Sequence, residues 1–345
     1  MNMFTTMAAK FARLFDTEAL AESSLVLAPL VLGAFVSERE VWLQASLVTI
    51  SSYIALKRSD LAPLGVVIHG FAIAAGFLSL LLSLAIPALF VLFAAIMAMA
   101  SIWVTAYGKE LRALGSFTFI PALYLACEIA ERTTMSGVLL QRGLAFLPYL
   151  AMGMVPVLLM SCIQHHLAAR ADFPYLRHFS KILQRSGSAQ LVHYWESIIA
   201  VTLSVAVAAA IVEGYHMNYG QWVIWSAASV VTGDMVSART KLRDRLVGAA
   251  IGVPAGVILG MALPHDRFVL ELAAVAAVMT LVIFRSYPVG VATRCACAAV
   301  LFVVAGQSSI AAAQRLENVA LGCMIGMAFV LATHATASRI VRRSP

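Results

Sequence analysis

The chain has 345 residues, of which 61% are hydrophobic and only 12% are charged, and its mean hydropathy is +0.90. Soluble domains are about half apolar and about a quarter charged, so this composition excludes a soluble globular protein. The net charge of +7 lies in short segments between apolar runs, which indicates membrane topology rather than a nucleic-acid partner.

The apolar runs predict an all-α integral membrane protein with about twelve transmembrane helices, each needing about 20 residues to span. Residues 1–22 come first and read as an interfacial amphipathic helix, with Lys10 and Arg13 opposite an apolar face. The expected spans then follow at 24–37, 41–56, 63–84, 86–107, 114–131, 144–168, 191–213, 219–236, 246–263, 268–285, 287–306 and 313–337.

These runs divide into two parallel six-helix repeats, residues 23–168 and 191–337. A basic cytoplasmic linker, residues 169–190, separates them, and a basic tail follows at 338–345. Trp42 precedes Ser46 with the spacing at which Trp222 precedes Ser226, which favours a duplication. Most Lys and Arg residues fall on the cytoplasmic side when the N-terminus is placed there, so the positive-inside rule predicts that both termini are cytoplasmic.

One segment of the second repeat is especially informative. An aromatic-led apolar run beginning at Trp222 reaches Asp234, and a short basic turn containing Arg239 and Arg245 is expected next. Gly248, Gly252 and Gly256 then recur at every fourth residue. Glycines at this spacing allow another helix backbone to approach closely, so the second helix of this cytoplasmic hairpin is expected to pack against protein.

This order of residues resembles the fusaric acid resistance protein-like family, relatives of the aromatic acid exporters, most closely over residues 190–337. The matching positions are Trp222, Asp234, Arg245, Gly248 and Gly252, and then Arg315, Asn318, Gly322 and Gly326. The first repeat departs from the pattern, because Ala62 stands in place of the arginine and His69 in place of the second glycine. The resemblance implies structural roles for Arg245, Gly248, Gly252, Arg315, Gly322 and Gly326.

Charged residues inside the membrane are costly, so each one suggests a function or a buried partner. Arg294 lies deepest and is predicted to bind a substrate carboxylate, although an internal ion pair with Asp234 or Glu196 would also explain it. Glu196 and Asp234 are the predicted proton-coupling carboxylates. The alternatives are a solvated Glu196 and an Asp234 that pairs with Arg243 or Arg245.

Trp222 and Trp225 lie one helical turn apart at the start of a span. They are predicted either to anchor the helix at the membrane interface or to stack on an aromatic substrate. The five cysteines lie within apolar runs and lack metal-ligand spacing, and no phosphate-binding loop or hydrolase motif is present. We therefore expect no enzyme activity, no metal and no cofactor.

The resemblance implies a multi-pass protein of the bacterial cytoplasmic (inner) membrane. Its expected function is secondary export of small organic acids, principally aromatic ones, driven by the proton gradient. An anion channel and a non-transporting membrane subunit of a larger complex are the alternatives. The expected partners are the lipid bilayer and a small organic anion, with a periplasmic membrane-fusion protein and a homodimer as further candidates.

Overall fold

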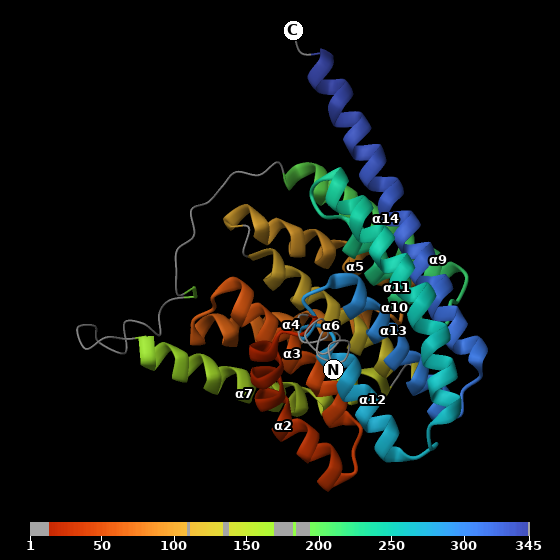
Figure 1. Ribbon diagram of the computed structural model, residues 1–345. Coiled ribbons are helices and arrows are strands. Elements are labelled where there is room, and N and C mark those ends of the chain that lie inside the picture. The colour runs from red at the N-terminus through yellow and green to blue at the C-terminus, as the bar shows by residue number, and fades with distance from the viewer. Residues whose placement is uncertain (1–13, 109–110, 134–137, 169–181, 184–193, 344–345) are drawn as a thin grey trace, which may run out of the picture. The chain divides into compact units, whose positions relative to one another are not determined.

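The computed structural model describes residues 14–108, 111–133, 138–168, 182–183 and 194–343. Their regular structure is helical (Figure 1), with two isolated bridges at Phe15–Phe284 and Leu61–Leu183. The helices are α2 (Thr17–Ser37), α3 (Val41–Ser59), α4 (Pro63–Ser83), α5 (Pro87–Trp103), the 3-10 helix η1 (Val104–Tyr107), α6 (Leu111–Glu131), α7 (Leu139–Ala168), α9 (Tyr194–Gly214), α10 (Gln221–Val230), α11 (Met235–Ala262), α12 (Arg267–Met279), α13 (Tyr287–Val304) and α14 (Ser309–Arg343).

Two predicted segments fall largely outside the described residues. The first part of the predicted interfacial helix, residues 1–13, is one of them, and residues 17–22 form the start of α2. The predicted linker, residues 169–190, is described only at Ile182 and Leu183. Both predictions therefore stay predictions.

The described α-helices follow the order of the apolar runs, but they do not all qualify as membrane spans. Nine helical segments in the described part of the chain are long and apolar enough to cross a membrane, which makes this a multi-pass membrane protein. Three described α-helices, α3, α10 and α12, fall outside this set. α10 and α12 have only 10 and 13 residues, or about 15 and 20 Å at 1.5 Å per residue. The hydrocarbon core is about 30 Å thick, so each reaches only part of the way.

Helix boundaries around Asp234 differ from the prediction. α10 ends at Val230, and the chain turns through Gly233, whose φ of +98° favours glycine. The Asp234 side chain accepts a hydrogen bond from the backbone N–H of Ser237 (2.7 Å), which caps α11. The basic residues from Arg239 to Arg245 consequently lie inside α11 instead of in a turn, because the cap starts the helix before them.

The chain forms two compact units, and each combines segments from both halves of the sequence. Unit 1 contains Met1–Ile50 and Arg243–Glu317, and unit 2 contains Ser51–Leu242 and Asn318–Pro345. In unit 1, α12 packs on α13 and on α2. In unit 2, α4 packs on α6 and α7, and α9 packs on α5 and α10. These two units do not correspond to the two predicted sequence repeats, which stay a prediction.

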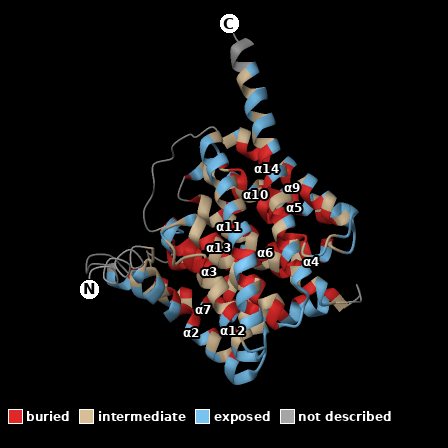
Figure 2. Ribbon diagram, turned by 45° about the vertical axis from the view of Figure 1, so that its right-hand side comes forward, coloured by how far each residue is buried: buried red, intermediate tan, exposed pale blue. Residues whose placement is uncertain are grey.

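The interior of unit 2 is built from large apolar side chains on these helices. Phe77 of α4 and Phe90 of α5 are fully buried, and Phe77 packs against Phe146 of α7 with ring centroids 5.5 Å apart. Buried positions recur along α4, α6 and α10 in Figure 2, whereas the outer surfaces carry exposed leucine, isoleucine and phenylalanine side chains. Exposed apolar surface of this extent is typical of helices that face lipid.

The family-motif glycines lie against helix backbones. In unit 1, a methyl group at Gly252 would overlap the carbonyl oxygen of Ala292 in α13, and one at Gly248 would lie 2.8 Å from Val291. In unit 2, methyl groups at Gly322 and Gly326 would overlap carbonyl oxygens of α10. This is the close approach that the four-residue spacing predicts.

Cysteine accessibility would test the predicted orientation of the chain. Single cysteines at Ser37 and Ser309 are expected to react with a membrane-impermeant maleimide added to intact cells, since both positions are exposed and are predicted to face outside. Cysteines at Lys57 and Arg239, which are also exposed, should react only in inverted vesicles. Ser59 is unsuitable because it is buried. Inverted labelling at two sites would contradict the topology.

Candidate functional site

In unit 1, a short connection joins α12 and α13, two helices that pack on one another. α12 ends at Met279 with Thr280 as its C-cap, and α13 begins at Tyr287 with a proline in its first turn. The connecting segment is held by backbone hydrogen bonds to the residues before α2, from Asp16 N to Ile283 O (2.9 Å) and from Arg285 N to Leu14 O (3.0 Å). These bonds fix the position of the connection next to the end of α12.

Arg294 contacts the C-terminal end of α12. Its guanidinium donates from Nε to Thr280 Oγ1 (3.1 Å) and from Nη2 to the Thr280 carbonyl (3.2 Å). The C-terminal end of a helix carries partial negative charge on its unpaired carbonyls, so a cation there is favourable. One internal partner of Arg294 is thus the C-terminal end of a helix. The alternative predicted from the sequence was a carboxylate side chain.

Two further arginines lie close to Arg294. Arg245 of α11 and Arg315 of α14 are 5% and 3% exposed, and the positive charges of both act on Arg294. Cys297 of α13 is within electrostatic range of Arg294 and Arg315. We call Arg245, Arg294 and Arg315 the arginine cluster. Two arginines from two other helices thus lie within electrostatic range of Arg294.

The glycine packing explains why Arg245 comes near α13. Arg245 lies one turn before Gly248 on α11, and the row from Gly248 to Gly256 fits against the backbone of α13. That fit holds the two helix axes closer than side chains with a Cβ would allow. The motif glycines therefore hold α11 against α13 at the level of the motif arginine, Arg245. The spacing of these residues in the sequence did not reveal this arrangement.

The tryptophan pair belongs to unit 2 and is buried. Trp222 and Trp225 are each 8% exposed and stack on one another with ring centroids 5.1 Å apart. Tyr124 of α6 packs edge-on against Trp222 at 5.8 Å. The two indoles thus pack inside a helical bundle, in contrast to the predicted interfacial anchors. Their predicted stacking on a substrate stays a prediction.

Asp234 lies in unit 2, in the short connection between α10 and α11. Arg112 of α6 donates to the carbonyls of Val231 and Thr232, at 2.7 Å for Val231, and so binds the open end of α10. The hydrogen bonds from Ser237 lower the pKa of Asp234, and the charge of Arg112 adds to this. A carboxylate held in its charged form suits helix capping better than proton transfer.

Glu196 lies in the first turn of α9, also in unit 2. Its Oε2 is 3.9 Å from Nδ1 of His334 on α14, and the two side chains are 41% and 56% exposed. Arg243, one of the two alternative partners predicted for Asp234, forms an ion pair with Asp244 (3.0 Å). Of the two predicted coupling carboxylates, Glu196 and Asp234, Glu196 is the one that lies near a histidine side chain.

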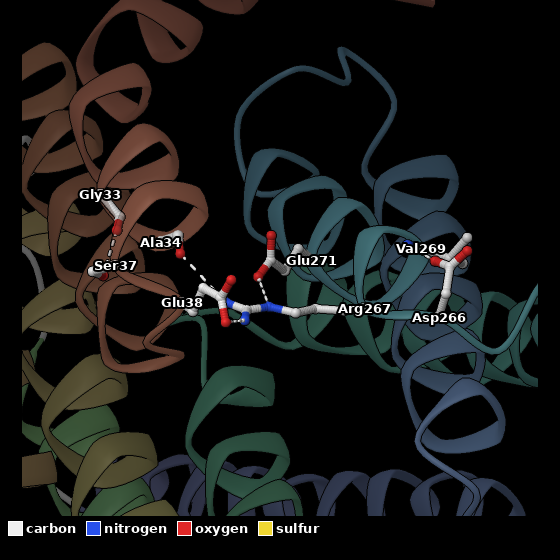
Figure 3. Close-up of polar contacts among 8 residues, drawn as sticks. All are labelled: Gly33, Ala34, Ser37, Glu38, Asp266, Arg267, Val269 and Glu271. Atoms are coloured by element: carbon white, nitrogen blue, oxygen red, sulfur yellow. Dashed lines mark hydrogen bonds and ion pairs between the residues drawn. The ribbon is translucent and has the colours of Figure 1, made fainter.

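Sequence reasoning missed an ion-pair group in unit 1 (Figure 3). Arg267 at the start of α12 donates to Glu271 Oε1 (2.6 Å), forms an ion pair with Glu38 (3.2 Å) and reaches the Ala34 carbonyl (3.4 Å). The hydrogen bond to Glu271 raises the pKa of the Arg267 guanidinium. Glu271 is only 3% exposed, and its four-residue spacing from Arg267 was the available signal.

Arg112 was missed as well, because its partners are carbonyl groups that no side-chain pattern shows.

A comparison with protein families matches residues 188–329 to the family described as fusaric acid resistance protein-like. This range contains α9 to α13 and most of α14, with all three members of the arginine cluster. No curated protein and no solved structure matches the chain.

Proposed function

Because residues 188–329 carry the fusaric acid resistance protein-like region, we propose that this multi-pass membrane protein exports small organic acids. The proposed substrates are principally aromatic carboxylates, the driving force is the proton gradient, and the location is the bacterial inner membrane. The arginine cluster is the observation that carries the proposal. It gathers three guanidinium groups near the C-terminal end of α12 in unit 1.

The chemistry of the cluster matches a carboxylate. A guanidinium group offers parallel N–H donors that fit the two oxygens of a carboxylate, and such charge-assisted hydrogen bonds are strong. Arg294 donates hydrogen bonds from Nε and Nη2 to Thr280. An arginine has five N–H donors, so the group can hold the helix end and still contribute to an anion site.

Proton coupling is assigned in the proposal to Glu196. Its Oε2 lies 3.9 Å from Nδ1 of His334, a side chain that can accept and release a proton, and both side chains are partly exposed. Asp234 is the weaker candidate because its hydrogen bonds favour the charged form. Replacing Glu196 by Gln should leave anion binding intact and remove the dependence of transport on the pH gradient.

Efflux from reconstituted liposomes tests the function. Purified protein should move radiolabelled benzoate, a simple aromatic carboxylate, against its concentration gradient when a pH gradient is imposed. A protonophore should abolish the uphill movement, and Glu196→Gln should retain only downhill exchange.

The other outcomes separate the alternatives. Downhill benzoate current that ignores the pH gradient would identify an anion channel. Flux that is absent from liposomes but present in native membranes would indicate a subunit that needs a partner.

A further inference from the structure

A hydrogen-bonded group joins the end of α6 to the start of α10 in unit 2. The Glu131 carboxylate accepts hydrogen bonds from the Gln221 side chain and from the backbone N–H of Tyr219. Asn318 of α14 holds the same connection, since its Nδ2 donates to the carbonyls of Asn218 (2.9 Å) and Tyr219 (3.2 Å). Three helices therefore meet through polar contacts at the residues that lead into α10.

Gln221 has an unsatisfied atom in this group. The residue is 3% exposed, and within the described residues its Oε1 is buried without a hydrogen-bond donor. A buried carbonyl oxygen without a donor is costly, and native proteins rarely leave one. The side-chain amide donates to Glu131 from Nε2, while its acceptor half receives nothing.

A proton on Glu131 would satisfy this atom. An ionised carboxylate can only accept hydrogen bonds, whereas a carboxylic acid also has an O–H donor. A carboxylic acid and a primary amide can form a cyclic pair, in which the acid O–H donates to the amide oxygen and the amide N–H donates to the acid oxygen. Protonation would therefore add the donor that Gln221 Oε1 lacks, and the side-chain amide of Gln221 would keep its orientation.

The surroundings of Glu131 are compatible with proton exchange. Its side chain is exposed on one side, so water reaches it. The charges that act on it are Glu128 of the same helix and Arg132 just after the helix, and these form an ion pair with each other (2.8 Å). Glu213 of α9 acts electrostatically on Cys127, which lies one turn before Glu131 on α6. Charge orientation predicts that this end of α6 faces the outer solution.

We infer that Glu131 and Gln221 form a proton-binding site at the outer end of the protein, with Glu131 carrying the proton and Gln221 accepting its hydrogen bond. The inference rests on the proposed proton-driven export and supplies the place where a proton enters. Glu131 also binds the N–H of Tyr219, whose φ of +56° is in the left-handed region. The proton thus changes the contacts at the start of α10, a helix whose backbone lies against Gly322 of α14.

Infrared titration of the full-length protein in lipid nanodiscs tests the site without any substrate. Wild-type protein should show the carbonyl stretch of a protonated carboxylic acid, with an intensity that falls as the pH is raised. Glu131→Gln should remove one carboxyl group's worth of this titrating signal. Glu128→Gln, one turn earlier on the same helix, should keep it, and Gln221→Met should shift its frequency because the amide partner is lost.

The outcomes separate this inference from the proposed function. A titrating signal that survives in Glu131→Gln would overturn the site, and so would a frequency that does not change in Gln221→Met. If Glu131→Gln does not fold, the Gln221→Met frequency decides alone. If the signal behaves as expected while liposomes show no proton-driven benzoate efflux, the proton site stands and the export proposal fails.

Discussion

Gly252→Leu is expected to remove most of the folded protein from the membrane. A methyl group at this position would already overlap the Ala292 carbonyl, so a leucine side chain has no space unless α11 separates from α13. Overpacking in a core usually costs about 1–3 kcal/mol, and an obstruction by backbone lies at or above that range because backbone cannot move aside as a side chain can. The measurement is the amount of monodisperse protein by fluorescence-detected gel filtration.

The matched control for this change is Ala250→Leu on the same helix. Ala250 is exposed, so the added carbons would face the surroundings of the helix and should be tolerated. Val253 is adjacent to Gly252 but only 4% exposed, which makes it unsuitable as a neutral control. Equal loss of folded protein in the Gly252 and Ala250 variants would contradict the close packing of α11 on α13.

Arg294→Lys is expected to lower benzoate transport by about 10- to 100-fold with a normal amount of protein in the membrane. Lysine keeps the positive charge but loses the planar fork that binds a carboxylate through two parallel hydrogen bonds. Hydrogen bonds to charged groups contribute about 1.5–3 kcal/mol, and each 1.4 kcal/mol corresponds to a factor of ten. The measurement is the initial rate in liposomes as a function of benzoate concentration, where the loss should appear mainly in KM.

Thr280→Val separates a binding role of Arg294 from a purely structural one. The valine removes the Oγ1 acceptor and leaves the carbonyl contact and the arginine in place. If Arg294 binds the substrate, this variant should transport at close to the wild-type rate. An equal fall in both variants would mean that Arg294 acts by holding the end of α12, and a wild-type rate in Arg294→Ala would remove it from the site altogether.

Several features could be predicted from the sequence because they depend on properties that each residue carries with it. Apolar runs indicated a multi-pass helical membrane protein, and the described helices follow those runs in order. The row from Gly248 to Gly256 predicted a buried helix face, because a missing side chain allows close approach whichever helix arrives. The family resemblance of the second half is confirmed over residues 188–329.

Helix ends were less predictable, because they depend on local capping as well as on hydropathy. The apolar run through Val231 continues past the end of α10, but Gly233 adopts a positive φ and Asp234 caps the next helix. Similarly, α12 stops at Met279 inside an apolar run. Window-averaged hydropathy does not register either event, since a helix can end wherever its carbonyls find another donor.

The sequence by itself determined the class of the protein, the order of its helices and the face of α11 that must be buried, because hydropathy and side-chain size act locally. Only the tertiary structure decided which polar groups meet. Arg245, Arg294 and Arg315 come from three helices, and Glu131 reaches Gln221 across a long stretch of chain. Such contacts depend on how helices pack, and packing is a property of pairs of surfaces that no single stretch of sequence contains.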